Sequence, residues 1–291
     1  MSQLSIIIVN FKTRDCLREC LRSIFGSQTQ FGFDVCVVDN ASTDGSVEMV
    51  KAEFPSVKLI ENKENLGYSK ANNQVLRKLV DNTLADSPRY FLLLNPDVEV
   101  ARDTFDKMLE FMDNNPIVGI CGCKVLKSDG SFDEACRRNF PNPARAFRYL
   151  TGLGRSSYHP DLPENKIAEV DSVMGAFLMI RKETVDTIGL LDENFFMYGE
   201  DLDWCWRAKT AGLKVIYAPL TTVIHHKGSS SRKLPGKALY EFHRAMQIFY
   251  NKHYRQDYNF LVNILVVMGI WLRYIMKVFF NSFRRNKYVS K

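Results

Sequence analysis

The sequence predicts an α/β protein with one mostly parallel sheet and helices on both of its faces. Two observations support this fold class. Short aliphatic or β-branched runs recur along the first 126 residues, and amphipathic stretches at helical spacing separate them. Strands that alternate with single helices form parallel sheets covered by helices. The expected strands are residues 4–11, 34–39, 57–61, 90–94 and 118–126.

The helices are predicted from apolar spacing and turn residues. Leu17, Leu21 and Ile24 fit one face of a helix after the first strand, and a second helix at 47–54 follows the turn at Asp44-Gly45. Beyond a connection rich in Arg, Pro and Gly at 137–165, a helix is expected from about residue 200 to 211. The strands expected there are 173–180, 214–218 and 223–228.

Charge is unevenly distributed along the 291 residues. Lys and Arg number 39 against 33 Asp and Glu, but residues 227–291 alone hold 13 basic and 2 acidic side chains. That end therefore carries +11 and the rest of the chain −5. One basic end favours contact with an anionic membrane surface and argues against a nucleic-acid binder. Seven cysteines without a Cys-x-x-Cys pair indicate reduced thiols in the cytoplasm.

Residues 260–287 predict a helix at the membrane interface. The first half is mostly apolar, and Arg273, Lys277 and Asn281 then form a polar stripe. Arg273 interrupts the run before the ~20 apolar residues that a membrane span needs. The basic end at 284–287 suits anionic headgroups. The alternative is a soluble helix whose apolar face packs on the rest of the protein.

Polar residues close several of the expected strands, at the sheet edge where α/β proteins bind ligands. Asn10 and Asp39 end the first two strands, and a carboxylate there can accept a hydrogen bond from a base or a ribose hydroxyl. The fourth strand leads into Asn95-Pro96-Asp97, which would place an oxygen ligand for Mg²⁺ or Mn²⁺ beside a substrate diphosphate. Ordinary turn chemistry is the alternative at both Asp39 and Asp97.

Three acids stand within four residues at the predicted start of a helix: Glu200, Asp201 and Asp203. They follow an aromatic run at 195–198, and a carboxylate beside such an apolar wall can act as a general base toward a hydroxyl. Alternatively, the acids only complement the helix dipole.

Two adjacent histidines, His225-His226, close the last expected strand of the second part. Neighbouring strand residues point to opposite sides, so at most one of them is expected to be functional. A neutral imidazole near Asp97 would complete a metal site, whereas the alternative is an exposed strand end.

Three common motifs are missing from the sequence: Gly-x-Gly-x-x-Gly after the first strand, Gly-x-x-x-x-Gly-Lys-Ser/Thr, and Gly-x-Ser-x-Gly. Instead, the motifs present closely resemble family 2 glycosyltransferases, in particular the rhamnosyltransferase-like enzymes of bacterial cell-surface polysaccharide synthesis. The resemblance covers about residues 4–231. It is carried by residues 8–10, 38–46, 65–73, 94–97, 174–176, 198–203 and 225–228.

The resemblance implies roles on the donor side. Asn10 and Asp39 would hold the base and ribose of the nucleotide, and Gly67 would lie against the nucleoside. Asn95 stands where the family has the first Asp of its Asp-x-Asp metal motif, which removes one charge from the donor site.

The resemblance also implies metal and acceptor roles. Asp97 matches the last Asp of that motif, and His225, preferred to His226, matches a histidine that joins the metal in some relatives. Asp201 matches the general base that deprotonates the acceptor hydroxyl. Gly175 and Glu200 match positions on the acceptor side.

The family has the GT-A fold, a single Rossmann-like sheet. Residues 1–231 would form this domain, with a nucleotide-sugar-binding half at 1–126 and an acceptor-binding half at 137–231. The basic helical region at 232–291 would associate with the membrane.

The implied activity is an inverting transfer of sugar to a hydroxyl of a lipid-linked saccharide or oligosaccharide. The donor is a nucleoside-diphosphate sugar, with dTDP-rhamnose favoured and a UDP-sugar next, and Mg²⁺ or Mn²⁺ is the cofactor. The enzyme would be peripheral, at the inner face of the cell membrane. Two alternatives stay open: a nucleotidyltransferase, for which residues 10–14 make a poor phosphate loop, and a non-catalytic nucleotide-sugar-binding subunit at the membrane.

Overall fold

The computed structural model describes residues 2–80, 88–145, 162–226 and 235–282. Its main sheet contains β1 (Ser2–Asn10), β2 (Gly32–Asp39), β3 (Lys58–Glu61), β4 (Tyr90–Leu94), β5 (Val98–Val100), β6 (Val118–Lys127), β8 (Ala168–Glu169), β10 (Phe177–Arg181) and β11 (Lys214–His225). The strand order is β3-β2-β1-β4-β10-β6-β11-β5, and β8 pairs with β11. The α/β class is confirmed.

The long strands of the sheet run in one direction, except for β10. β1 is parallel to β2 and β4, β2 is parallel to β3, and β6 is parallel to β11. β10 lies between β4 and β6, antiparallel to both, so β6 runs the same way as β4. The segment before β10 therefore meets the segment after β4. The amide of Asn95 donates to the carbonyl of Ala176 at 3.0 Å.

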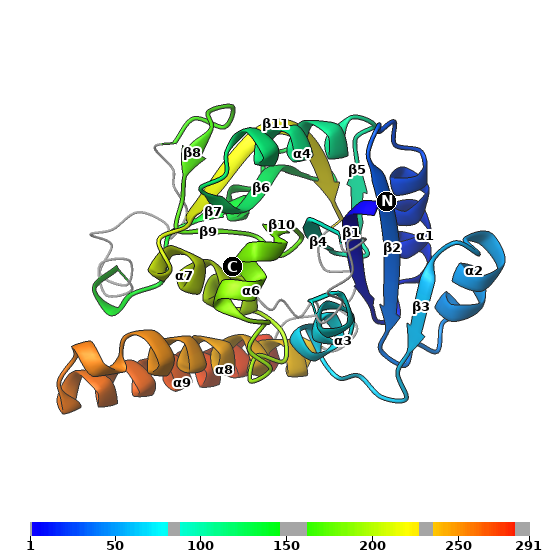
Figure 1. The fold of residues 1–291 in the computed structure, drawn as a ribbon. Helices are drawn as coiled ribbons and strands as arrows, with labels where there is room; N and C mark the ends of the chain where they lie inside the picture. Colours follow the sequence, from blue (N-terminus) through cyan, green and yellow to red (C-terminus); the bar gives the residue numbers. More distant parts are fainter. Residues whose placement is uncertain (1, 81–87, 146–161, 227–234, 283–291) are drawn as a thin grey trace.

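Helices cover both faces of this sheet (Figure 1). They are α1 (Arg14–Phe25), α2 (Ser46–Glu53), α3 (Tyr68–Val80), α4 (Thr104–Asn114), α6 (Lys182–Ile188) and α7 (Glu200–Thr210). α1, α2 and α4 lie over one face, and α3, α6 and α7 over the other. The predicted apolar face of α1 is buried at Leu17, Leu21 and Ile24, and each such side chain contributes about 1.5–3 kcal/mol of burial.

The expected strand at 173–180 is two strands, β9 (Ser172–Val173) and β10. The chain leaves the sheet between them at Gly175, whose amide donates to a side chain instead of a neighbouring strand. β9 pairs with β7 (Arg137–Arg138), so the expected connection begins with a strand. Residues 146–161 of that connection lie outside the described part.

The expected strands at 214–218 and 223–228 are one strand, β11. Its register with β6 shifts between Tyr217 and Thr222. Pro219 in this stretch has no amide hydrogen for the ladder, which accounts for the shift. Residues 227 and 228, which belong to the last motif of the resemblance, lie outside the described part.

The C-terminal helices, α8 (Pro235–His253) and α9 (Phe260–Ser282), lie side by side below the sheet domain (Figure 1). The indole nitrogen of Trp271 donates to Gln247 at 2.9 Å, and the hydroxyl of Tyr250 donates to Asn263 at 2.5 Å. Ile270 is buried in this contact. One side of α9 therefore packs against α8.

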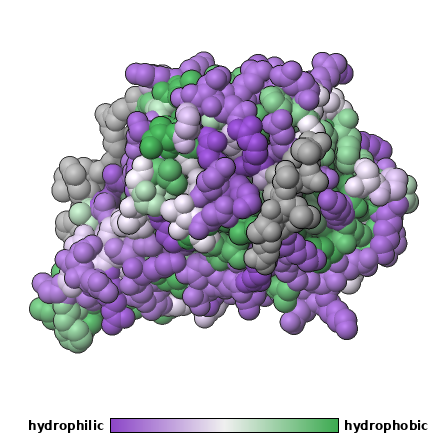
Figure 2. Space-filling view, in the orientation of Figure 1, coloured by the Kyte–Doolittle hydropathy of each residue, from purple (hydrophilic) through white to green (hydrophobic). Residues whose placement is uncertain are grey.

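The other side of α9 is apolar and exposed. Its large exposed side chains are Phe260, Leu261, Ile264, Leu265, Met268, Leu272, Ile275, Met276, Val278, Phe279 and Phe280. Hydrophobic surface gathers at the lower left of Figure 2, at one end of this helix pair. By length and composition, α9 is the one helix among the described residues that is long and apolar enough to cross a membrane.

The polar stripe of α9 lies on the side near α8. Arg273 and Lys277 are half-buried. Burial lowers the pKa of the buried His243 on α8, and the charges of Arg273 and Lys277 lower it further. The basic end at 284–287 lies outside the described residues.

Candidate active site

Two predicted donor-side residues, Asn10 and Asp39, contact each other at the carboxyl edge of the sheet. The amide nitrogen of Asn10 donates to Oδ2 of Asp39 at 2.7 Å, and both side chains are buried. Oδ1 of Asp39 accepts the backbone amide of Ser42 at 2.8 Å. The parallel register of β1 and β2 pairs these two residues directly. They shape the loop that follows β2 and still leave acceptor capacity on the Asp39 carboxylate.

Gly67 joins the loop after β3 to the aromatic run before α7. Its φ of +84° is in the left-handed region, and a Cβ there would lie 2.5 Å from the carbonyl oxygen of Phe196. The amide of Tyr68 donates to that same oxygen at 2.6 Å. The glycine thus has a packing reason in this structure, while its predicted contact with the nucleoside stays a prediction.

Asp97 and His225, the predicted metal ligands, lie together. The imidazole Nε2 of His225 is 3.1 Å from Oδ1 of Asp97, and both side chains are buried. The antiparallel pairing of β5 with β11 places them so, because His225 pairs with Val98. His226 points elsewhere, to Glu99 at 2.6 Å and Ser128 at 3.0 Å. Of the two histidines, the structure therefore brings His225 to Asp97, while its role as a metal ligand stays a prediction.

The Asp97–His225 pair fits a divalent ion. Nδ1 of His225 is buried without a hydrogen-bond partner among the described residues. A carboxylate and an imidazole suit Mn²⁺ and, for the oxygen, Mg²⁺. The described residues contain no group of three or more metal-ligating side chains. Phosphate oxygens of a donor would therefore have to supply further ligands.

Asp201, the predicted base, lies in the first turn of α7 and is almost fully buried. Its Oδ2 accepts from a guanidinium nitrogen of Arg138 at 2.7 Å and from the amide of Gly175 at 2.8 Å. Its Oδ1 accepts the amide of Leu202 at 2.8 Å. The predicted acceptor-side Gly175 thus touches the predicted base.

Glu200 precedes Asp201 and is buried, with Oε2 unpaired among the described residues. Burial raises the pKa of its carboxyl to about 8, and the neighbouring charge of Asp201 adds to the effect. Glu200 therefore holds its proton at neutral pH. Two adjacent carboxyl groups in different environments can divide acid and base roles between them.

Asp203, the third acid of the cluster, differs from Glu200 and Asp201 in that several basic side chains surround it. Its side chain is fully buried and pairs with Arg207 at 2.9 Å, Lys252 at 2.8 Å and His253 at 2.8 Å. Burial would raise the pKa of Asp203, but the hydrogen bond from His253 and the two nearby cations outweigh it and lower the pKa. Asp203 therefore links α7 to α8 and has no open side for a substrate hydroxyl.

Sequence reasoning missed two residues that meet at this site. Arg138 lies in a segment that was predicted to be a connection. Tyr68 belongs to the motif at residues 65–73, but no role was expected for its hydroxyl. This hydroxyl donates to the carbonyl of Gly175 at 3.0 Å. Burial and the charges of Glu200 and Asp201 raise the pKa of Tyr68 well above its usual value. A buried tyrosine beside acids was not recognisable from spacing alone.

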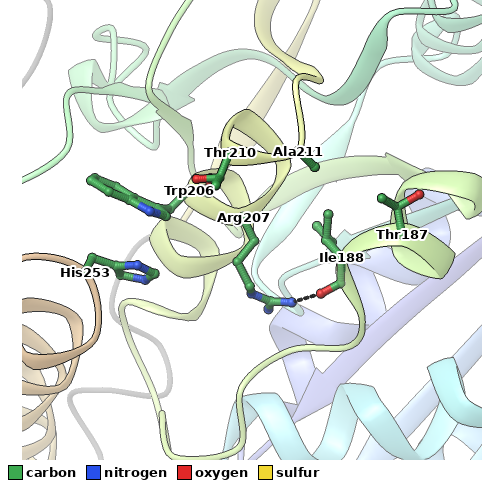
Figure 3. Close-up of a pocket in the computed structure, with 7 residues that line it drawn as sticks. All are labelled: Thr187, Ile188, Trp206, Arg207, Thr210, Ala211 and His253. Carbon is green, nitrogen blue, oxygen red and sulfur yellow. Dashed lines mark hydrogen bonds between the residues drawn. The ribbon is translucent and has the colours of Figure 1, made fainter.

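A pocket of about 350 Å³ lies away from these residues, on the C-terminal half of α7 (Figure 3). It is lined by Thr187, Ile188, Trp206, Arg207, Thr210, Ala211 and His253. Arg207 donates to Asp203 and to backbone carbonyls of residues 188–190, and His253 bonds to Asp203. Its main polar groups are thus already paired, and no predicted site residue lines it.

The model of glycosyl transferase family 2 matches residues 5–189, more than half of the 291 residues. The chain belongs to this family. It is a rhamnosyltransferase-like family 2 glycosyltransferase, as the sequence motifs predicted, and the nucleotidyltransferase alternative is set aside. The match includes Asn10, Asp39 and the Asn95-Pro96-Asp97 segment but ends before α7.

This family 2 glycosyltransferase is 28% identical over 259 residues to the N-acetylglucosaminyl-diphospho-decaprenol L-rhamnosyltransferase of Mycobacterium tuberculosis, covering 84% of this chain and 83% of the relative. It is 27% identical over 230 residues to the low-salt glycan biosynthesis hexosyltransferase Agl10 of Haloferax volcanii, covering 78% and 68%.

Among solved structures, the mannosyltransferase PcManGT from Pyrobaculum calidifontis, in complex with GDP-Man and Mn²⁺, superimposes with a TM-score of 0.59 at 18% identity. The superposition covers 87% of this chain but only 64% of the mannosyltransferase. The likeness concerns the fold, and it confirms the GT-A fold.

Proposed function

We propose that this glycosyltransferase is inverting and metal-dependent, and that it transfers rhamnose from dTDP-rhamnose to a hydroxyl of a lipid-linked saccharide. The observation that carries the proposal is the placement of Asp97–His225 and Asp201 on the same edge of the sheet. Asp97 follows β4, His225 ends β11, and Asp201 bonds to the loop that pairs with Asn95. These positions support a diphosphate site and a base at one edge of the sheet.

On the donor side, Asn10 and Asp39 bind the nucleoside, Gly67 lies against it, and Asn95 flanks the diphosphate. Asp97 and His225 hold Mg²⁺ or Mn²⁺ together with phosphate oxygens. When bound, the ion supplies positive charge for the leaving diphosphate. The carboxylate of Asp97 contacts the imidazole of His225, and the backbone carbonyl of Asp97 accepts the amide of His226, which holds the residue in place.

On the acceptor side, Asp201 takes the proton of the acceptor hydroxyl as its oxygen attacks the anomeric carbon. The nearest acid, Glu200, is protonated below about pH 8 and is therefore a poor nucleophile. Glu200 instead offers a hydrogen-bond donor toward the acceptor, beside the Gly175 loop. One displacement, with inversion of configuration, follows from this assignment.

The similar proteins indicate a substrate class. The Mycobacterium tuberculosis relative is named for a rhamnosyl transfer to an N-acetylglucosaminyl-diphospho-decaprenol. This name supports dTDP-rhamnose as donor and a lipid diphosphate sugar as acceptor, within cell-surface polysaccharide synthesis. A UDP-sugar is the second candidate donor.

The exposed face of α9 indicates a location at the membrane surface. A long row of apolar side chains faces away from α8 and is exposed, which suits the boundary between headgroups and acyl chains. Arg273 on the α8 side argues against a full span, because a charge at the bilayer centre costs about 3 kcal/mol or more. The enzyme would therefore be peripheral at the cytoplasmic face of the cell membrane.

A donor screen tests the proposal. The purified protein is incubated with dTDP-rhamnose, UDP-GlcNAc, UDP-glucose or GDP-mannose, with Mn²⁺ or Mg²⁺, and a short-chain N-acetylglucosaminyl-diphospho-lipid. Release of nucleoside diphosphate and the NMR anomeric configuration of the product are measured. Transfer from dTDP-rhamnose with inversion supports the proposal, whereas retention of configuration, or transfer from another donor alone, contradicts it.

A further inference from the structure

The carboxylate of Asp201 is held unequally at its two oxygens. Oδ2 accepts two hydrogen bonds, from Nη2 of Arg138 at 2.7 Å and from the amide of Gly175 at 2.8 Å. Oδ1 accepts one, from the amide of Leu202 at 2.8 Å. Since each carboxylate oxygen has two lone pairs, Oδ2 is fully used and Oδ1 has one pair left.

Resting on the proposed function, we infer that Arg138 is a positioning residue for Asp201, and that Oδ1 is the oxygen that takes the acceptor proton. Arg138 and the Gly175 amide fix Oδ2, so the carboxylate presents its other oxygen to the hydroxyl. In the transfer, the acceptor O–H bond breaks and its proton goes to Oδ1. The acceptor oxygen bonds to the anomeric carbon, and the electrons of the sugar–phosphate bond leave with the nucleoside diphosphate.

Arg138 is itself fixed from the side of β9. The same Nη2 lies 3.0 Å from the hydroxyl of Ser172 and 2.6 Å from the carbonyl oxygen of Val173, so its two hydrogens are shared among these acceptors and Oδ2 of Asp201. The pairing of β7 with β9 sets Arg138 opposite Ser172. A guanidinium held in this way gives up little side-chain freedom when it orients a carboxylate.

Tyr68 completes the arrangement from the nucleotide-binding half. Its hydroxyl donates to the carbonyl of Gly175, and its amide donates to the carbonyl of Phe196. A Cβ on Gly175 would lie 3.4 Å from Oδ2 of Asp201, so the loop is packed closely on the base. Gly175 is therefore held at both of its backbone polar groups, by Tyr68 at its carbonyl and by Asp201 at its amide.

The test uses Arg138→Gln and Arg138→Lys, with Arg137→Gln as the matched control. Arg137 is the neighbouring buried arginine, but its guanidinium donates to the carbonyl of Pro163 and stacks on Phe132 and Tyr217 instead. With dTDP-rhamnose and the short-chain lipid acceptor, we expect Arg138→Gln to lower kcat about 10- to 100-fold while the donor KM stays unchanged. Arg138→Lys should recover part of kcat, and Arg137→Gln should lower Tm without lowering kcat per folded enzyme.

Equal kcat losses in Arg138→Gln and Arg137→Gln, or wild-type kcat in Arg138→Gln, would overturn the inference. A crystal structure of Arg138→Gln gives a second readout that needs no substrate. The Asp201 carboxylate should rotate away from the Gly175 amide, and an unmoved carboxylate would contradict the inference even if no tested donor is used. Absence of transfer by the wild-type protein from every donor concerns the proposed function alone.

Discussion

His225 and Asp97 are separated by 128 positions in the sequence, yet their side chains lie 3.1 Å apart in a buried contact. The contact depends on β5, a strand of three residues that pairs with the end of β11. The pairing of this short strand with β11 places Asp97, the residue just before it, beside His225.

The first prediction concerns metal binding at this pair. Because the described residues offer only these two ligands together, Mn²⁺ should bind weakly to the free protein and clearly in the presence of dTDP. Isothermal titration with and without dTDP measures the difference. His225→Ala should weaken the nucleotide-dependent binding, whereas His226→Ala should not, because the imidazole of His226 contacts Glu99 and Ser128 instead of Asp97. Full activity in excess chelator would disprove the metal assignment.

The second prediction separates two acids of α7. Asp201→Asn should leave donor affinity nearly intact and lower turnover ~10²–10⁴-fold, the range of general acid–base catalysis. Asp203→Asn should mainly lower stability, by about 1.5–3 kcal/mol, because it weakens the charge-assisted hydrogen bonds of a fully buried carboxylate to Arg207, Lys252 and His253. Turnover and urea unfolding are measured for both variants. The reverse pattern would mean that Asp203 is the base.

The third prediction concerns Glu200 and pH. Its pKa is about 8 in the folded protein against an ordinary 4.5, so the folded state binds this proton more tightly. The stabilisation is complete below about pH 4.5 and is lost as the pH rises through 8. Glu200→Gln, which cannot ionise, should therefore gain stability relative to wild type between pH 5 and 8.

Urea unfolding at several pH values measures this effect. Glu48→Gln, at an exposed position of α2, serves as the control and should follow the wild-type pH profile. A constant difference between Glu200→Gln and wild type over this pH range would contradict the raised pKa.

The fourth prediction concerns α9. Leu265→Ser with Leu272→Ser, on the exposed face, should reduce sedimentation with anionic vesicles at low salt and leave Tm unchanged. Ile270→Ser, on the α8 side, should lower Tm by removing a packed side chain. Truncation after Asp257 should release the protein from membranes while donor hydrolysis remains measurable. A full-length chain that never sediments with such vesicles would make α9 a packing element.

The carboxyl ends of the first strands were predictable from the sequence, because a polar residue such as Asn10 or Asp39 directly follows a buried aliphatic run. The order and spacing of the motifs along the chain also allowed the family, and with it the GT-A fold, to be predicted. These features are local, so the residue pattern alone contains them.

Contacts between distant segments were not predictable in this way. Arg138 lies in a two-residue strand, too short to give a periodic signal, and its partner Asp201 is 63 positions away. The break at Gly175 was missed because its neighbours are apolar and continue a strand pattern. The polar stripe of α9 was recognised from its spacing, but only the packing of α8 decides which side it faces.

The contacts of Asp203 with Lys252 and His253 join α7, which carries the proposed base Asp201, to α8, which leads into α9. If α9 lies in the lipid interface, α8 would hold the proposed base, Asp201, at a fixed height above the bilayer. An acceptor anchored in the same leaflet would then present only those hydroxyls that reach this height. Selection among the sugars of a growing lipid-linked chain would follow from distance, in addition to contacts with the sugar itself.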